Sequence, residues 1–179
     1  MYINNLFNGS SIASFQDELF QKENNIKIVN ATYCFANSSL VSLDKANVWD
    51  LPNIVDLTAA FENCTKLKGS INFSFASSSL ARCTQMFRNC YNIGGIDNNA
   101  MKPEEANDAI SDNLFEQSSK LTHVDFMFEN CYALYGNLPE KLFENNRSLS
   151  SAEAMFKNCS CLRGSIPDLF SNKAGYNSL

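Results

Sequence analysis

Residues 121–136 read LTHVDFMFENCYALYG, and the pattern in this stretch recurs along the chain and decides its fold. Its centre is Phe128, which is followed two residues later by Asn130 and then at once by Cys131. Apolar residues stand seven, four and one positions before the phenylalanine and six positions after it, and Gly136 closes the stretch. Self-similarity of this kind is the mark of a repeat architecture, so we aligned the whole chain on this phenylalanine.

The same pattern occurs five times. The anchor phenylalanines are Phe35, Phe61, Phe87, Phe128 and Phe156, at spacings of 26, 26, 41 and 28 residues. An asparagine follows each anchor by two positions, and these are Asn37, Asn63, Asn89, Asn130 and Asn158. A cysteine comes next in four units, at Cys64, Cys90, Cys131 and Cys159, and an apolar residue follows each anchor by six positions, at Val41, Leu67, Ile93, Leu134 and Leu162. Phe7 marks a degenerate sixth copy, so residues 1–179 are predicted to form one repeat domain of about six units.

Repeats of this length predict a stack of coils in which each coil contacts only its neighbours. Backbone groups of one coil must be paired by the next, which favours a parallel ladder of short strands before each anchor, although the apolar spacing would also suit a helix. A second motif predicts short helices on the convex side, since two of its copies follow a proline. Its copies are Glu18-Leu19-Phe20, Asn113-Leu114-Phe115, Lys141-Leu142-Phe143 and Asp168-Leu169-Phe170.

The 41-residue unit contains an insertion near residues 97–112. The extra residues would break the pairing of the coils on either side, so the segment from about Ile96 to Ser119 is predicted to be extruded. Pro103-Glu104-Glu105 is typical of a helix start. Insertions within repeats often project from one face and carry recognition, which makes this segment a plausible partner contact.

The repeated polar residues are expected to be structural. A stacked amide can pair with groups in the neighbouring turn, which predicts an asparagine ladder. The cysteines lack the close pairs typical of zinc sites, and equivalent positions in a stack have poor disulfide geometry, so reduced core thiols are expected. His123 is the single histidine, and phosphate-loop, dinucleotide and nucleophile-elbow motifs are missing. We therefore expect no catalytic, metal or cofactor site.

The composition narrows the range of partners. The formal net charge is −5 and no lysine or arginine cluster occurs, which argues against nucleic acid. No apolar run approaches the roughly 20 residues that a membrane-spanning helix needs, so membrane insertion is not expected. Residues 1–5 lack the charged and apolar regions of a signal peptide.

The stretches 121–136 and 149–167 resemble the bacterial surface-protein repeat of about 26 residues, which is related to the BspA-like leucine-rich repeats with their MF-x-x-C-x-x-L signature. The resemblance covers nearly the whole chain, with Ser10 and Ser38 departing from it where cysteine is expected. It implies an α/β repeat solenoid, a right-handed leucine-rich-repeat-like coil. It further implies a surface-exposed or adhesive protein, at the cell surface, outside the cell or in a virion, that binds proteins or glycans without catalysis.

Variable residues beside the repeat framework are the candidate partner-binding positions. They are Tyr33, Arg82, Gln85, His123, Asp125 and Glu153. Their mixed chemistry fits a non-catalytic interaction module better than a site for a repetitive ligand. The rival hypothesis is a structural segment of a larger surface or virion assembly, in contact with further repeats or a neighbouring subunit, because neither end shows the polar cap that terminal repeats need.

Overall fold

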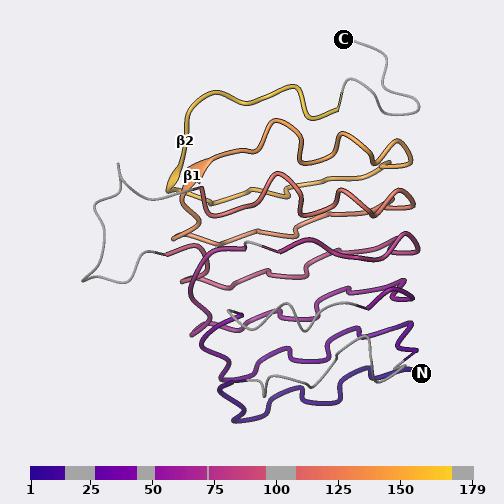
Figure 1. Cartoon of the computed structure of the whole chain (residues 1–179). Coiled ribbons are helices and arrows are strands. Elements are labelled where there is room, and N and C mark those ends of the chain that lie inside the picture. The colour runs from indigo at the N-terminus through magenta and orange to yellow at the C-terminus, as the bar shows by residue number, and fades with distance from the viewer. Residues whose placement is uncertain (15–26, 44–50, 72, 96–107, 171–179) are drawn as a thin grey trace.

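A computed structural model describes residues 1–14, 27–43, 51–71, 73–95 and 108–170. The described chain winds into elongated coils that stack from the N-terminal end to the C-terminal end (Figure 1). The anchor phenylalanines of neighbouring coils stack ring on ring, so each of these coils carries one anchor. The repeat unit in the sequence is therefore one coil of the stack.

A six-residue turn segment carries each anchor. The segments are residues 4–9, 32–37, 58–63, 84–89, 125–130 and 153–158. Within the fourth coil, Arg88 N donates to Gln85 O at 3.1 Å, which closes a β-turn. The alternate amides point along the stack, so that Gln85 N donates to Asp125 O at 2.8 Å and Phe87 N to Met127 O at 2.9 Å. Turn bonds and bonds between coils together satisfy the backbone of the segment.

Regular strands are short in this structure. Strands β1 (Gly136–Asn137) and β2 (Leu162–Arg163) pair in parallel, with Gly136 opposite Leu162. Elsewhere, successive coils meet at isolated parallel bridges just before the turn segments, and these join Tyr2, Asn30, Asp56, Arg82, His123 and Ser151 in that order. Among the described residues, the predicted ladder of strands is thus reduced to one two-residue pair and single bridges, because the turns use the intervening amides.

The described residues contain no helix, so the predicted α/β class with short convex-side helices is wrong. The second motif instead forms turns at residues 112–117 and 140–145. Leu142 N donates to Pro139 O and Glu144 N to Lys141 O, with a separation of three residues rather than the four of an α-helix. Proline and acidic residues also start β-turns, which explains the misleading signal. Residues 168–170 form no helix either, and the copy at 18–20 lies outside the described residues.

Two columns of phenylalanine rings form the centre of the core. The first contains the anchors and Phe7, with centroids of neighbouring rings 5.1–5.7 Å apart. The second contains Phe75, Phe115, Phe143 and Phe170, with centroids 5.6–6.0 Å apart. Phe35, Phe61, Phe87 and Phe128 are buried, whereas Phe156 is half-buried. The second motif is therefore a second core column.

The predicted insertion is shorter than residues 97–112. Ile110 bridges Ile71 in the neighbouring coil, and both Ala109 and Ile110 are buried. A Cβ added to Gly94 would lie 2.9 Å from the Cβ of Ala109, so this part of the chain packs tightly against the stack. Residues from 108 onward therefore belong to a coil and are not extruded. Residues 97–107, with the helix start predicted at Pro103, lie outside the described residues.

Candidate interaction face

The turn segments bring the variable residues of successive coils onto one side of the molecule. We use the name turn face for the outward side chains of the six turn segments together with the bridge residues two positions before each of them. Intercoil hydrogen bonds in every segment hold its backbone at a fixed register. Equivalent side chains therefore form columns that run along the stack.

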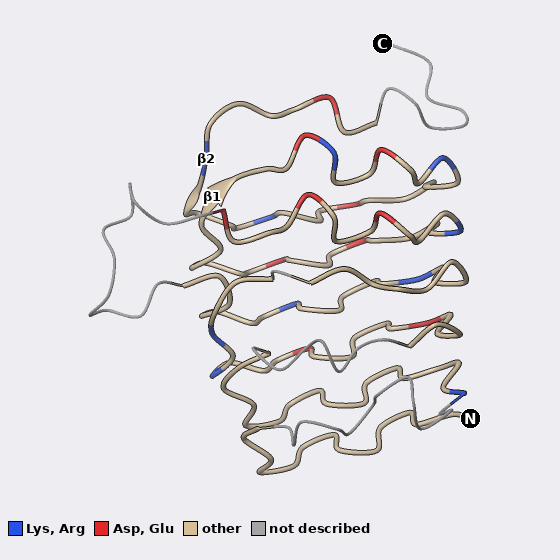
Figure 2. Cartoon of the chain, in the orientation of Figure 1, with Lys and Arg blue, Asp and Glu red and all other residues tan. Residues whose placement is uncertain are grey.

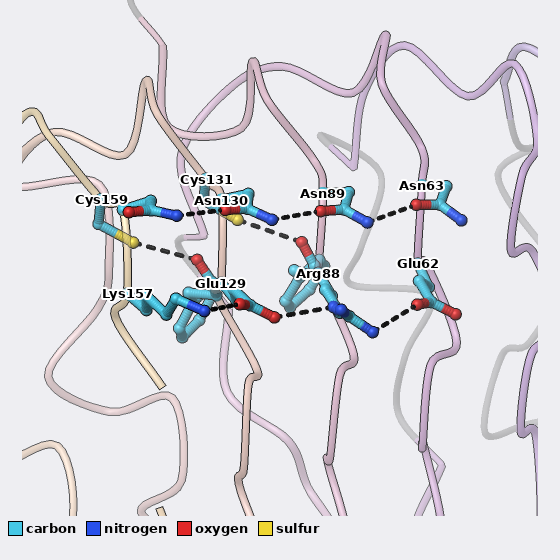
Figure 3. Close-up of polar contacts among 12 residues, drawn as sticks. Glu62, Asn63, Arg88, Asn89, Glu129, Asn130, Cys131, Lys157 and Cys159 are labelled. Carbon is cyan, nitrogen blue, oxygen red and sulfur yellow. Dashed lines mark hydrogen bonds and ion pairs between the residues drawn. The ribbon is translucent and has the colours of Figure 1, made fainter. Parts of the chain in front are cut away.

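An asparagine ladder crosses the turn face. From Asn37 onward, the Nδ2 atom of each asparagine donates to the Oδ1 atom of the preceding one at 2.7–2.9 Å, in the order Asn8, Asn37, Asn63, Asn89, Asn130, Asn158. Figure 3 shows the part of this ladder from Asn63 to Asn130. The five predicted members all have positive φ, between 57° and 63°. Asparagine tolerates this left-handed backbone better than most residues, so conformation and hydrogen bonding both explain the column.

The cysteines beside this ladder point into the core. Each thiol donates to the carbonyl of the anchor phenylalanine in the preceding coil, at Sγ–O distances of 3.0–3.1 Å, and the donors are Cys64, Cys90, Cys131 and Cys159. All four are free and buried. Burial raises the pKa of Cys159 to about 12 and that of Cys90 well above its ordinary value. The thiols of Cys90 and Cys159 therefore stay protonated near neutral pH and are poor nucleophiles and metal ligands. The pKa of Cys64 is instead lowered, chiefly by its hydrogen bond with Cys90.

A charged ladder runs parallel to the asparagine ladder, one residue after each of the last four anchors. Its members alternate in sign along the stack and are Glu62, Arg88, Glu129 and Lys157 (Figure 3). Arg88 lies 3.6 Å from Glu62 and 2.8 Å from Glu129, and Lys157 Nζ donates to Glu129 Oε1 at 2.8 Å. The hydrogen bond from Lys157 and the nearby Arg88 charge hold the pKa of Glu129 below its ordinary value. Sequence analysis missed this ladder, although the aligned column shows the alternation.

The bridge column contains a second ion pair. Arg82 Nε donates to Asp56 Oδ2 at 2.9 Å, and the Asp56 Oδ1 atom accepts the Thr58 amide at 2.9 Å. In the coil after that of Arg82, Asp125 accepts the Ser151 hydroxyl and the Glu153 amide of the following coil. Carboxylates on this face therefore lock adjacent coils together, which restricts the side chains around them.

All six candidate partner-binding residues lie on the turn face, at most half-buried. Tyr33, Arg82, His123 and Glu153 are exposed, whereas Gln85 and Asp125 are half-buried. Arg82 and Asp125 already make contacts within the chain, and His123 Nδ1 lies 2.9 Å from the hydroxyl of Thr122. The structure thus places the candidates together on one surface, with two of them fixed by ion pairing or hydrogen bonding.

A shallow pocket of about 440 Å³ lies around β1, with Asp108, Asp112 and Glu140 in its lining. Asp108 is engaged there by the amide of Asn137 at 2.8 Å. No group of histidine, cysteine and acidic residues suitable for a metal ion occurs among the described residues. None of the described segments forms a helix long and apolar enough to cross a membrane.

Comparison with known proteins overturns the resemblance inferred from the repeat. A family model described as "Mycoplasma protein of unknown function, DUF285" matches residues 2–120 and, in a second overlapping match, residues 29–169. The match names a different family from the BspA-like 26-residue repeats, and the lack of any helix among the described residues gives no support to a leucine-rich repeat. The MF-x-N-C core was misleading because its residues also suit a stacked turn, in which the phenylalanines stack, the asparagines bond between coils and the thiols bond to carbonyls. No curated protein and no solved structure matches the chain significantly.

Proposed function

The chain belongs to the DUF285 family, and we propose that it is a non-catalytic interaction module that binds a protein partner through the turn face. The observation that carries this proposal is the placement of Tyr33, Arg82, His123 and Glu153 as exposed side chains on one face of hydrogen-bonded coils. The turns hold the backbone beneath them, so little conformational freedom is lost when a partner binds.

The distribution of charge supports a protein partner rather than a glycan. On the turn face, the segments of the first two coils, residues 2–9 and 30–37, carry no charged side chain, and the nearest charged residue in the sequence is Lys27, just before the second segment (Figure 2). The later coils present Arg82 and Glu153 with opposite charges. A face with a neutral polar half and a mixed-charge half can select a partner by complementary charges. Tyr33, 37% exposed, adds an aromatic side chain of the kind enriched at binding hot spots.

The experiment is a screen of the purified chain against protein and glycan arrays, followed by affinity measurements on the partner obtained. Tyr33→Ala and Glu153→Lys should each weaken binding at least about tenfold, the size expected of a hot-spot residue. Tyr132→Ala and Glu140→Lys are matched controls, because both residues are exposed and lie outside the turn face. The controls should bind as the parent does.

The outcomes are distinguishable. Protein binding that is lost only in the turn-face variants supports the proposal. If the chain binds only glycans, and the turn-face variants weaken that binding, the proposed partner class is wrong and the proposed binding surface is right. Binding that the control variants reduce as much as the turn-face variants do would refute the face.

A further inference from the structure

The hydrogen bonds between turn segments all run in one direction. Between neighbouring coils, the amide of the anchor donates to a carbonyl of the following coil. The amides two and four residues before the anchor, and the amide two residues after it, do the same. Between the first two coils, for example, Asn5 N donates to Thr32 O at 3.0 Å and Phe7 N to Cys34 O at 2.7 Å. The stack therefore has polarity, and its two ends cannot be alike.

The first coil exposes acceptors at its outer edge. Among the described residues, no donor reaches the backbone carbonyls of Tyr2, Asn4, Leu6 and Asn8, which are the positions that receive amides in the other coils. The last described coil exposes the matching donors. The amides of Ala152, Ala154, Phe156 and Asn158 meet no acceptor within the described part of the chain. One end thus presents a row of acceptors, and the other presents donors at the same spacing.

A buried hydroxyl at the first coil points to the same missing neighbour. Ser10 occupies the position of the column cysteines, whose side chains donate to the anchor carbonyl of the preceding coil, as Cys64 does to Phe35 O at 3.1 Å. The Ser10 Oγ atom is buried and has no hydrogen-bond partner in the described structure. A preceding coil would supply a carbonyl to it.

The ends also leave core positions open to solvent. Leu6 is 55% exposed, although the residues that precede the other anchors are all buried. Phe7 and Phe156, the terminal rings of the first phenylalanine column, are each half-buried. Apolar side chains at both ends would be covered if another coil packed on each of them.

We propose that a second copy of this chain stacks head to tail, with its first coil on the last coil of its neighbour. The amides of one copy that meet no acceptor among the described residues, including Phe156 N, then donate to the carbonyls of the next copy that receive no donor there, including Leu6 O. Ser10 Oγ donates to the carbonyl of Phe156, and the rings of Phe7 and Phe156 stack. No like charges meet at the charged ladder, because Lys157 faces the neutral Asn8.

This interface is heterologous, since the two contacting surfaces differ. A heterologous contact that does not close into a ring produces open filaments whose length grows with protein concentration. The proposal is independent of the turn face, which remains accessible along the side of such a filament.

The test is sedimentation velocity over a concentration series, together with electron microscopy of the concentrated sample. The parent should form a ladder of oligomers and filaments. Leu6→Lys should lower the association constant at least about tenfold, because the interface would bury an unpaired charge. Val41→Lys is the matched control, because Val41 is also an exposed apolar residue, at 44%, but lies in the second coil. It should assemble like the parent.

Mixing distinguishes the geometry. The Leu6→Lys variant keeps an intact last coil, so it can bind the first coil of a parent chain. No further chain can then bind to the altered first coil of the variant, so adding the variant to the parent should shorten the filaments. A parent that stays monomeric at all concentrations overturns the proposal. So does equal assembly of Leu6→Lys and Val41→Lys, or a closed dimer that forms between parent chains only.

Discussion

Asn89 donates from its Nδ2 atom to Asn63 Oδ1 of the preceding coil at 2.8 Å, while its own Oδ1 atom accepts from Asn130 at 2.7 Å. The same residue has a φ of 60°. One side chain therefore meets two demands of the fold, a left-handed backbone and a continuous ladder between coils.

These two demands can be separated by substitution. Asn89→Gly keeps the left-handed backbone and loses two hydrogen bonds, each contributing about 1 kcal/mol. Asn89→Ala loses the same bonds and adds about 1 kcal/mol of backbone strain, so it should be the less stable variant in urea unfolding. Equal stabilities would show that the φ of this position contributes nothing to the choice of asparagine.

The anchor phenylalanines should contribute strongly to stability. Phe87 is fully buried and stacks on Phe61 and Phe128 with centroids 5.4 and 5.6 Å away. Phe87→Ala should therefore lower the free energy of unfolding by about 3–5 kcal/mol through cavity formation. Phe156→Ala is the matched control, because its half-buried ring should cost less. A loss below about 1 kcal/mol for Phe87→Ala in urea melts would contradict the core assignment.

The charged ladder should make stability depend on pH. The folded-state pKa of Glu129 is lowered, so its stabilising contribution is present above the ordinary value of 4.5 and is lost as the pH falls through the lowered value. Burial raises the pKa of Glu62, which therefore contributes in the opposite direction. Glu129→Gln should cost about 1 kcal/mol at pH 7, and its deficit relative to the parent should shrink toward pH 3.

Glu62→Gln serves as the comparison, because its deficit should be smaller at pH 7 and should not shrink on acidification. Thermal melts of both variants and the parent between pH 3 and pH 7 measure these differences. Identical pH profiles for the two variants would refute the assignment of opposite pKa directions.

The thiols should react in two classes. Six thiols are buried and should label slowly in the folded chain. Burial raises the pKa of five of them, which are Cys34, Cys83, Cys90, Cys131 and Cys159. The pKa of Cys64 is lowered by its hydrogen bond with Cys90, so its slow labelling should depend on limited access alone. Cys161 is exposed and should label at once. All seven cysteines should label after denaturation without reductant. Fewer than seven would reveal a disulfide, and fast labelling of Cys131 would contradict its place in the core.

The repeat, its register and the anchor column could be predicted from the sequence because they depend on identical residues at fixed spacings. Helices were predicted wrongly at Lys141-Leu142-Phe143, because proline and acidic residues serve β-turns as well as helix starts. Val41 aligns with the buried Leu67 yet is 44% exposed, which alignment alone could not distinguish.

The candidate site was only partly predictable. The exposed position of His123 followed from its place beside the framework, whereas the ion pairing of Arg82 with Asp56 depends on the distance between coils. The charged ladder was visible as alternating signs from Glu62 onward but was not recognised. These residues can be identified as ion pairs only when it is known that equivalent positions of adjacent coils lie side by side.

Amide hydrogen exchange, measured residue by residue by NMR on the dilute chain, tests the central claim that the described residues form a stack of polarised turns without helices. The amides of Gln85 and Phe87 should be protected by their bonds to the next coil, whereas those of Ala154 and Phe156 should exchange rapidly. Continuous protection of consecutive amides through residues 112–117 and 140–145, with helical chemical shifts, would contradict the account.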